Sequence, residues 1–314
     1  MKKAFVLLTS VILLAILSFA MTGCSGGNEF MQALNKYTEK TEQISASFDG
    51  IEIVSDTADL TFVPANECKI EYTTHKRITY STTVENGVLK IKLEDNRHWF
   101  EKIFSLGHSS KLTVYLPTGE YSSLTVNQAT GDINVPAGYT FGNVDISLST
   151  GDTSFCASTN EALKIHATTG DITLVNISCG SLDTKVTTGK TYLTNVSVIG
   201  DASVTVSTGK SYLTNVSCTN FTSTGNTGDI EMTSLIASGK IDIERSTGDV
   251  DFSACDAEEI YVTTGTGSVK GTLLTNKIFQ VRTSTGKIDV PESWEGGKCK
   301  ITTTTGKIEI SIGQ

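Results

Sequence analysis

A threonine–glycine pair recurs ten times between Thr130 and Gly306, and the spacing between successive glycines is always 19 or 20 residues. A repeat this short excludes helical repeats, which need about 33 residues or more, and propeller blades, which need about 40. One coil of a β-solenoid is the repeating unit that remains. The ten glycines are Gly131, Gly151, Gly170, Gly189, Gly209, Gly228, Gly248, Gly267, Gly286 and Gly306.

Apolar residues alternate with polar ones on both sides of each repeat glycine. Leu163 and Ile165 precede Gly170, and Ile172 and Leu174 follow it. A period of two indicates two short strands joined by a bend, with the apolar side inward. The chain is therefore predicted to be all-β: a single-stack parallel β-solenoid with 19–20 residues per coil, right-handed by the general crossover preference.

Coils stacked at about 4.8 Å would place equivalent residues in columns along the rod. Asn176, Asn195 and Asn215 are expected to form one such column. Aspartates that follow a repeat glycine would form another, either as a weak Ca²⁺ site or as a solvated bend. We favour the bend, because aspartate is a common turn residue and the spacing departs from that of the short calcium-binding repeats. No metal site is therefore predicted at these three residues: Asp132, Asp152 and Asp171.

The N-terminus has the pattern of an export signal. Lys2 and Lys3 precede an uncharged apolar run over residues 4–20, which is slightly short for a spanning helix. The segment that follows, Met21-Thr22-Gly23-Cys24, resembles the lipobox of bacterial lipoproteins. The resemblance implies cleavage before Cys24, acylation of Cys24 by chains such as palmitate, and an extracytoplasmic, lipid-anchored location on the inner or outer membrane. Ordinary cleavage, or an uncleaved anchor, is the alternative.

Four segments are predicted: a signal peptide over 1–23, a tether or short helix over 24–47, N-terminal β coils and cap over 48–126, and regular solenoid repeats over 127–314. Asn86-Gly87 predicts a hairpin turn. An insertion at 95–110 carries apolar residues on one face of a short helix, either as a lid over the end of the coil stack or as a partner- or membrane-contacting element. These residues are Trp99, Phe100, Ile103 and Phe104.

Composition limits the classes of function. A net charge of −9 argues against a nucleic-acid partner, which would require a basic surface. Six cysteines remain besides Cys24, and none forms a CxxC pair, so a zinc or redox motif has no support. We expect them to be buried free thiols that pack as small hydrophobes.

The STGD, TTGD, TTGK and STGK units, preceded by Leu116-Pro117 closing a strand, resemble the bacterial "putative adhesin" family of unknown function. The resemblance covers residues 48–312. It implies a β-solenoid fold and brings no catalytic residues with it.

No enzyme and no cofactor are predicted. The constant spacing leaves no coil with a long loop for an active site, and no Ser/His/Asp or paired-carboxylate pattern stands out. Tyr192 and Tyr212, outward and one turn apart beside Lys190 and Lys210, form the candidate contact patch. We predict a lipid-anchored, adhesin-like binding module of the cell envelope, with an envelope protein or polysaccharide as its partner. The alternative is a structural or envelope-stress protein that acts through partner or self assembly.

The C-terminal end of the stack is expected to be open. Ile308, Ile310 and Ile312 would lie in the last layer, with no helix or polar loop after them. Solenoids normally need caps. An end-to-end homo-oligomer is therefore expected, and a fold-back of an N-terminal segment is the alternative.

Overall fold

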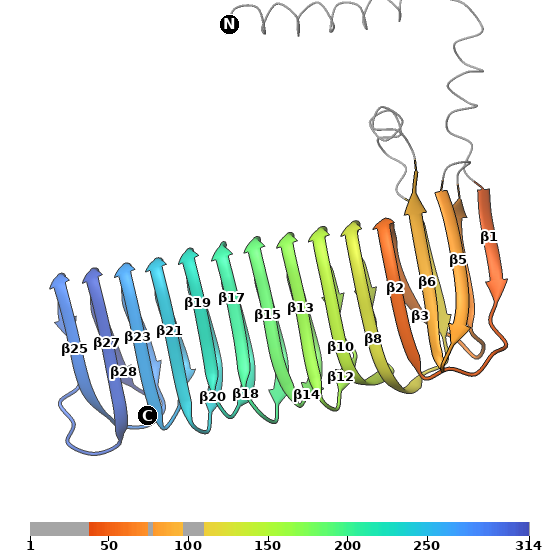
Figure 1. Cartoon of the computed structure of the whole chain (residues 1–314). Coiled ribbons are helices and arrows are strands. Elements are labelled where there is room, and N and C mark those ends of the chain that lie inside the picture. Colours follow the sequence, from red (N-terminus) through yellow and green to blue (C-terminus); the bar gives the residue numbers. More distant parts are fainter. Residues whose placement is uncertain (1–37, 75–77, 97–109, 314) are drawn as a thin grey trace, which may run out of the picture.

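The structure, a computed structural model, describes residues 38–74, 78–96 and 110–313, and every regular element in these residues is a strand. The strands form two 14-stranded sheets, sheet A and sheet B, which enclose the core of a long rod (Figure 1). In the regular part each coil contributes one strand to each sheet, and the pairing between coils is parallel. The predicted parallel β-solenoid is therefore confirmed.

Sheet A lies on one face of the rod. Its strands, in spatial order, are β1 (Thr38–Gln43), β4 (Lys69–Thr74), β7 (Lys111–Leu116), β3 (Asp59–Pro64), β9 (Ile133–Val135), β11 (Thr153–Phe155), β14 (Ile172–Cys179), β16 (Thr191–Val198), β18 (Ser211–Cys218), β20 (Ile230–Ala237), β22 (Val250–Cys255), β24 (Val269–Leu273), β28 (Ile308–Ile312) and β26 (Ile288–Asp289).

Sheet B lies on the opposite face. Its strands, in spatial order from the C-terminal end, are β25 (Lys277–Thr285), β27 (Gly297–Thr305), β23 (Glu259–Thr266), β21 (Lys240–Thr247), β19 (Phe221–Thr227), β17 (Ala202–Thr208), β15 (Ser181–Thr188), β13 (Ala162–Thr169), β10 (Tyr139–Thr150), β8 (Gly119–Thr130), β2 (Gly50–Thr57), β6 (Val88–Asp95) and β5 (Ile78–Glu85), with β12 (Ser158–Thr159) paired to β10.

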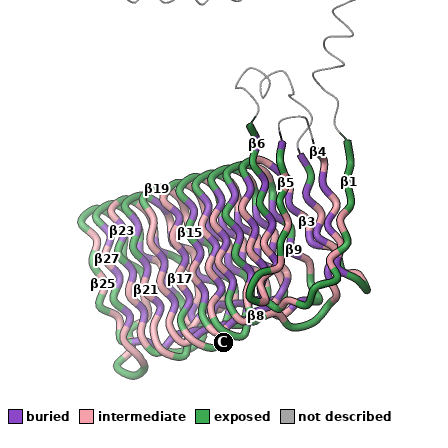
Figure 2. The backbone as a smooth tube through the Cα atoms, turned by 45° about the vertical axis from the view of Figure 1, so that its right-hand side comes forward, coloured by how far each residue is buried: buried purple, intermediate pink, exposed green. Residues whose placement is uncertain are grey.

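The core is a continuous apolar column between the two sheets. Buried and less buried residues alternate along the strands, so that the buried positions run as bands through neighbouring coils (Figure 2). Neighbouring coils compensate for each other's volume: the small Ala202 lies between Leu182 and Phe221, and all three are at most 2% exposed. Such compensation keeps the interior close-packed although the repeat varies in sequence.

The repeat glycines occupy the corner where the chain passes from sheet B to sheet A. Gly189 has φ of 146°, a conformation that residues with a side chain rarely adopt. A Cβ at this position would lie 2.0 Å from the carbonyl oxygen of Gly170 in the preceding coil. The glycine is therefore required by the close stacking of the corners as well as by the backbone angle.

At the N-terminal end, the coils are not stacked in the order of the sequence. The coil of β2 and β3 contacts the regular coils, and the coil of β6 and β7 lies outside it. β4, β5 and β1 then pair antiparallel to their neighbours. The hairpin predicted at Asn86-Gly87 is confirmed, with φ of 52° and 77° and with Glu85 paired to Val88.

Thr38–Gln43 was expected to belong to a tether or short helix, and it is strand β1 instead. The edge of β4 explains the difference, because the chain gains six in-register pairs along it, from Thr38↔Thr74 to Gln43↔Lys69. The residues of the predicted insertion, Trp99, Phe100, Ile103 and Phe104, lie outside the described residues, as does Cys24.

The C-terminal end differs from the prediction in its coil order. The last coil in the sequence, β27 and β28, lies between the coil of β23 and β24 and the coil of β25 and β26. Ile308 and Ile310 are therefore 0% and 4% exposed, and the prediction that they form the open terminal layer is wrong. The chain leaves β26 after two residues, and a loop over 290–296 returns it to the face of β23.

The terminal coil is fastened by a buried lysine at the start of β25. Lys277 is 3% exposed, and its Nζ lies 2.7 Å from the Asp256 carboxylate. The same ammonium donates to the Ala257 carbonyl and the Thr275 hydroxyl, both at 2.7 Å. All three N–H groups of the ammonium are therefore used.

The cysteines behave as the sequence predicts. All six that the structure describes are free, and five of them are buried. Burial raises the pKa of Cys179, Cys218 and Cys299 to about 12. These thiols stay protonated and pack as apolar groups.

Candidate functional site

The predicted tyrosine pair lies on the outer face of sheet A. Thr191 and Leu193 point into the core, so Tyr192 between them points outward, and Tyr212 takes the equivalent place one coil later. The two rings stack with centroids 5.1 Å apart and planes 8° from parallel. Each tyrosine therefore covers one ring face of the other and leaves its second face toward the next coil.

The two lysines beside the tyrosines are not equivalent. Hydrogen bonding to Tyr192 raises the pKa of Lys190, so this lysine belongs to the tyrosine pair. The Nζ of Lys210 instead lies 2.7 Å from the Asp229 carboxylate in the next coil. That hydrogen bond lowers the pKa of Asp229. The patch therefore presents one cation, Lys190, and one neutralised ion pair.

An asparagine ladder runs beside the tyrosine pair, as predicted. Asn176, Asn195 and Asn215 have φ of 55°, 54° and 55°, and their amides are linked by Nδ2–Oδ1 hydrogen bonds of 2.7 and 2.9 Å. Asparagine tolerates this left-handed conformation, which it adopts within β14, β16 and β18. Within the described residues, the Nδ2 of Asn176 and the Oδ1 of Asn215 have no protein partner. The ladder thus offers a donor at one end and an acceptor at the other.

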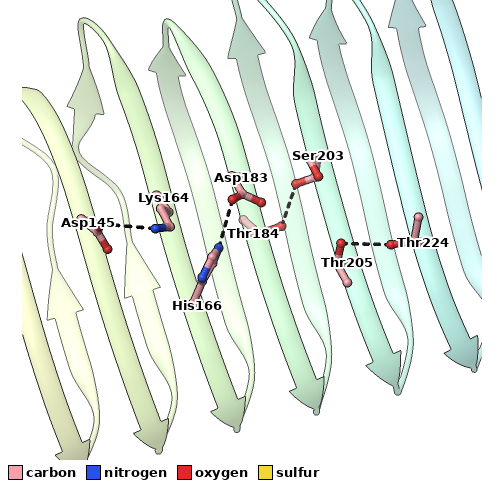
Figure 3. Close-up of polar contacts among 8 residues, drawn as sticks. All are labelled: Asp145, Lys164, His166, Asp183, Thr184, Ser203, Thr205 and Thr224. Atoms are coloured by element: carbon pink, nitrogen blue, oxygen red, sulfur yellow. Dashed lines mark hydrogen bonds and ion pairs between the residues drawn. The ribbon is translucent and has the colours of Figure 1, made fainter.

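The outer face of sheet B is polar and largely pairs with itself. Lys164 lies 3.5 Å from Asp145, the His166 ring lies 3.0 Å from Asp183, and the hydroxyls of Thr205 and Thr224 are 3.0 Å apart (Figure 3). A shallow groove of about 310 Å³ lies beside His166 and is also lined by Asn127, Ser147, Lys185 and Thr187. The sequence analysis singled out no histidine as a site residue. The 19-residue register was the signal that could have placed His166 beside Asp183.

The aspartates after the repeat glycines have a structural role that neither sequence interpretation included. The Oδ1 atom of Asp132 accepts the backbone N–H of Asp152 at 2.8 Å, and that of Asp152 accepts the N–H of Asp171 at 2.8 Å. Each carboxylate thereby satisfies a corner N–H of the next coil. Within the described part of the chain, no cluster of His, Cys, Asp or Glu could hold a metal ion.

Arg245, like Lys277, is a buried cation that sequence reasoning missed. Its side chain occupies an inward position of β21, is 5% exposed, and donates to the Ser223 hydroxyl at 2.7 Å. Burial lowers the pKa of Arg245 to about 10. Gly225 makes the space, because a Cβ there would lie 2.3 Å from the guanidinium. The arginine is enclosed by protein and is not part of an outer binding face.

The coil architecture and the polar outer faces define a two-sheet β-solenoid whose accessible side chains include an asparagine ladder and a stacked tyrosine pair. The chain belongs to the Toastrack DUF4097 family, whose model matches residues 48–210 and 199–314. In the part of the chain that the structure describes, no helix is long and apolar enough to span a membrane.

Three solved structures align with most of this chain at low sequence identity. A "putative adhesin" from Bacteroides fragilis is 11% identical, covers 88% of this chain and 98% of its own, and has a TM-score of 0.39. A "putative lipid binding protein" from Parabacteroides distasonis is 12% identical, with the same coverage and a TM-score of 0.33. A "putative adhesin" from Parabacteroides merdae is 12% identical over 88% of this chain and 97% of its own, with a TM-score of 0.32. No curated protein matches the chain.

Proposed function

We propose that this protein is a lipid-anchored, extracytoplasmic rod that binds a polysaccharide of the cell envelope through sheet A, without catalysis. The observation that carries the proposal is the stacked pair of Tyr192 and Tyr212 beside the asparagine ladder. Tyrosine provides an apolar ring with a polar tip, and it loses little conformational entropy on binding. Sugars present apolar ring faces and hydroxyl groups, which match the tyrosine rings and the amide ends of the ladder.

The scarcity of apolar groups on this face favours a glycan over a protein. Among the large hydrophobics along the middle of the rod, only Ile199 and Ile236 are exposed. A stable protein interface needs an apolar, desolvated centre. The tyrosine patch instead has aromatic rings, amides, hydroxyls and one cation, Lys190, and this composition suits a polar polymer.

The anchor rests on the sequence around Cys24. If Cys24 is acylated, the Cys24→Ala protein should leave the membrane fraction or accumulate as an unprocessed precursor, because two or more acyl chains provide stable anchoring. Cleaved Cys24→Ala protein that stays in the membrane fraction would contradict the anchor.

The binding proposal is tested by co-sedimentation of the full chain, in detergent, with purified insoluble cell-wall polysaccharide. The variant is Tyr192→Ser with Tyr212→Ser. The control is Tyr261→Ser, because Tyr261 lies on sheet B and donates to Glu259 at 2.8 Å. We expect the paired variant to bind at least about tenfold more weakly, a loss of about 1.4 kcal/mol, and the control to bind normally. Equal binding by the wild type, the paired variant and the control would show that the tyrosine patch does not bind the polysaccharide.

A further inference from the structure

The exposed apolar residues gather at one end of the rod. The structure describes six large hydrophobics as exposed, and four of them lie on or beside the terminal coil: Leu274 (46%), Ile278 (41%), Ile288 (43%) and Trp294 (90%). Phe279, Val281 and Val290 in the same coil are only partly buried. We call this surface the tip. Exposed apolar residues concentrated in this way mark an interaction site.

The tip also has two open strand edges. β25 is the last strand of sheet B and stands at the end of the rod (Figure 1). β26 is the last strand of sheet A, so within the described residues neither strand has a neighbour on its outer side. β25 is nine residues long, and Arg282 is its only charged residue apart from the buried Lys277. At the other end of the rod, the edge strand β1 carries Glu39, Lys40 and Glu42, which discourage strand addition.

We propose that the tip binds the tip of a second copy of this chain, related by a two-fold axis perpendicular to both sheets. Rotation about such an axis reverses the strand direction and the stacking direction, but keeps each sheet on its own side. β25 would therefore pair antiparallel with its counterpart, and both sheets would continue from one rod into the next. The partly buried Phe279 and Val281 would close against the same residues of the partner copy.

Charge on the tip supports a second copy in this orientation. Arg282 lies one residue past the middle of β25, on the side of the Thr285-Gly286 corner. Glu292 and Glu295 lie in the loop at the opposite end, because Gly297 after that loop pairs with Lys277 at the start of β25. None of these three residues makes an ion pair with a described residue. The antiparallel arrangement turns the half of β25 that carries Arg282 toward the acidic loop of the other copy.

A lipid surface does not fit the tip as well. The backbone N–H and C=O groups along an open strand edge cannot be satisfied in hydrocarbon, and each unsatisfied group costs several kcal/mol there. A second copy of the terminal coil satisfies the edge and covers the apolar layer together. The self-association is independent of the proposed polysaccharide binding, since it uses the end of the rod and not its face.

The proposal is tested by sedimentation velocity of the full chain in detergent over a range of concentrations. We expect a monomer–dimer equilibrium in the wild type and a dissociation constant at least about 100-fold higher in Ile278→Lys with Ile288→Lys. Ile199→Lys with Ile236→Lys is the control, because it adds the same charges at exposed isoleucines away from the tip. This control should dimerise normally.

An exchange of charges between Arg282 and the acidic loop distinguishes a lost interface from a misfolded variant. Arg282→Glu should weaken the dimer, and adding Glu292→Arg with Glu295→Arg to it should restore the dimer. A wild type that is monomeric at every concentration would overturn the proposal, as would a dimer that the tip variant leaves intact or that the control weakens equally. A monomer that binds phosphatidylglycerol vesicles through the tip would also overturn it, in favour of a lipid-binding tip.

Discussion

The corner glycines show how one missing side chain controls the stacking of the whole coil. Gly189 and Gly119 both have φ near 150°, at 146° and 150°. A Cβ on Gly189 would meet the Gly170 carbonyl at 2.0 Å, whereas a Cβ on Gly119 would have no atom within 4 Å. Substitutions at the two positions therefore distinguish the cost of backbone strain from the cost of steric overlap.

Gly189→Ala should consequently destabilise the protein more than Gly119→Ala. We expect about 1 kcal/mol for Gly119→Ala from the backbone conformation alone. Gly189→Ala should cost roughly 3 kcal/mol or more, because a neighbouring coil must also move. Urea denaturation measures both. Equal losses in the two variants would show that coil stacking does not depend on the missing side chain.

The buried thiols predict the response to alkaline pH. The pKa of Cys179 is raised to about 12 in the folded protein from an ordinary value of 9.0. The folded state therefore keeps a proton that the unfolded state loses above pH 9. Stability should then fall as pH rises from about 9 toward 12, by about 1.4 kcal/mol per pH unit for each such thiol.

Cys179→Ala should reduce this pH dependence by the contribution of one thiol. The matched control is Val198→Ala, because Val198 is paired with Cys179 in the adjacent coil and is also buried. The control should lower stability without changing its slope with pH. Urea denaturation between pH 8 and 10.5 tests this. If Cys179→Ala left the slope of stability with pH unchanged, the raised pKa of Cys179 would be contradicted.

Residue types at fixed spacing were sufficient to predict the columns of equivalent residues along the rod. They were not sufficient to predict contacts between non-equivalent positions of neighbouring coils. The asparagine ladder follows from the repeat, because in-register stacking brings equivalent residues together. The pairing of Lys210 with Asp229 could not be predicted in the same way. A lysine at this position can contact tyrosines of its own coil or a carboxylate of the next coil, and the choice depends on side-chain rotamers that the sequence pattern does not contain.

At the scale of the element, lysines of the terminal coil form one buried and one exposed ion pair with aspartates, and the contributions of the two pairs to stability can be compared. Lys277–Asp256 and Lys287–Asp289 both have N–O distances of 2.7 Å. The first pair is 3% and 16% exposed, and the second is 66% and 65% exposed. Breaking a buried pair leaves an uncompensated charge, whereas an exposed pair contributes little.

Lys277→Met should therefore destabilise the terminal coil by about 3 kcal/mol, and Lys287→Met should change it by less than about 1 kcal/mol. Hydrogen exchange of the β25 amides measures the local effect. We expect faster exchange in β25 for Lys277→Met and wild-type exchange in the middle of the rod. Equal protection of β25 in both variants would mean that Lys277 does not fasten the coil.

The strands were predictable from the sequence, and their order at the two ends was not. Every coil carries the same alternation, so β27 with Thr305-Gly306 fits against β23 or against β25 equally well by pattern. The signal for the exchange lies in the connection: β26 has only two residues, and Pro291 and Gly296 interrupt the alternation after it. Such a break indicates a departure from the regular coil without saying where the chain returns.

At the scale of the molecule, the three proposed functions lie in different parts of the rod. The predicted anchor belongs to the N-terminal end, the tyrosine patch to the middle of sheet A, and the self-association to the tip. The fourteen strands stacked in sheet A give a length of about 60 Å between the outermost strands. The tip therefore lies at the opposite end of the rod from β1, the described strand nearest in the sequence to the predicted anchor.

Both the tip and the faces depend on the coil order, and this order can be measured directly with pairs of introduced cysteines. Tyr261 and Lys300 are neighbours in register, and Lys300 is in turn the neighbour of Gln280. Adjacent strands place Cα atoms about 4.8 Å apart, within the range of a disulfide. Two strand steps, about 9.6 Å, exceed that range.

Oxidation of Tyr261→Cys with Lys300→Cys should therefore form an intramolecular disulfide, detected by mass spectrometry. Tyr261→Cys with Gln280→Cys should remain reduced under the same conditions. A solenoid stacked in simple sequence order predicts the reverse. A disulfide between positions 261 and 280, with positions 261 and 300 remaining reduced, would contradict the coil order and the tip that it creates.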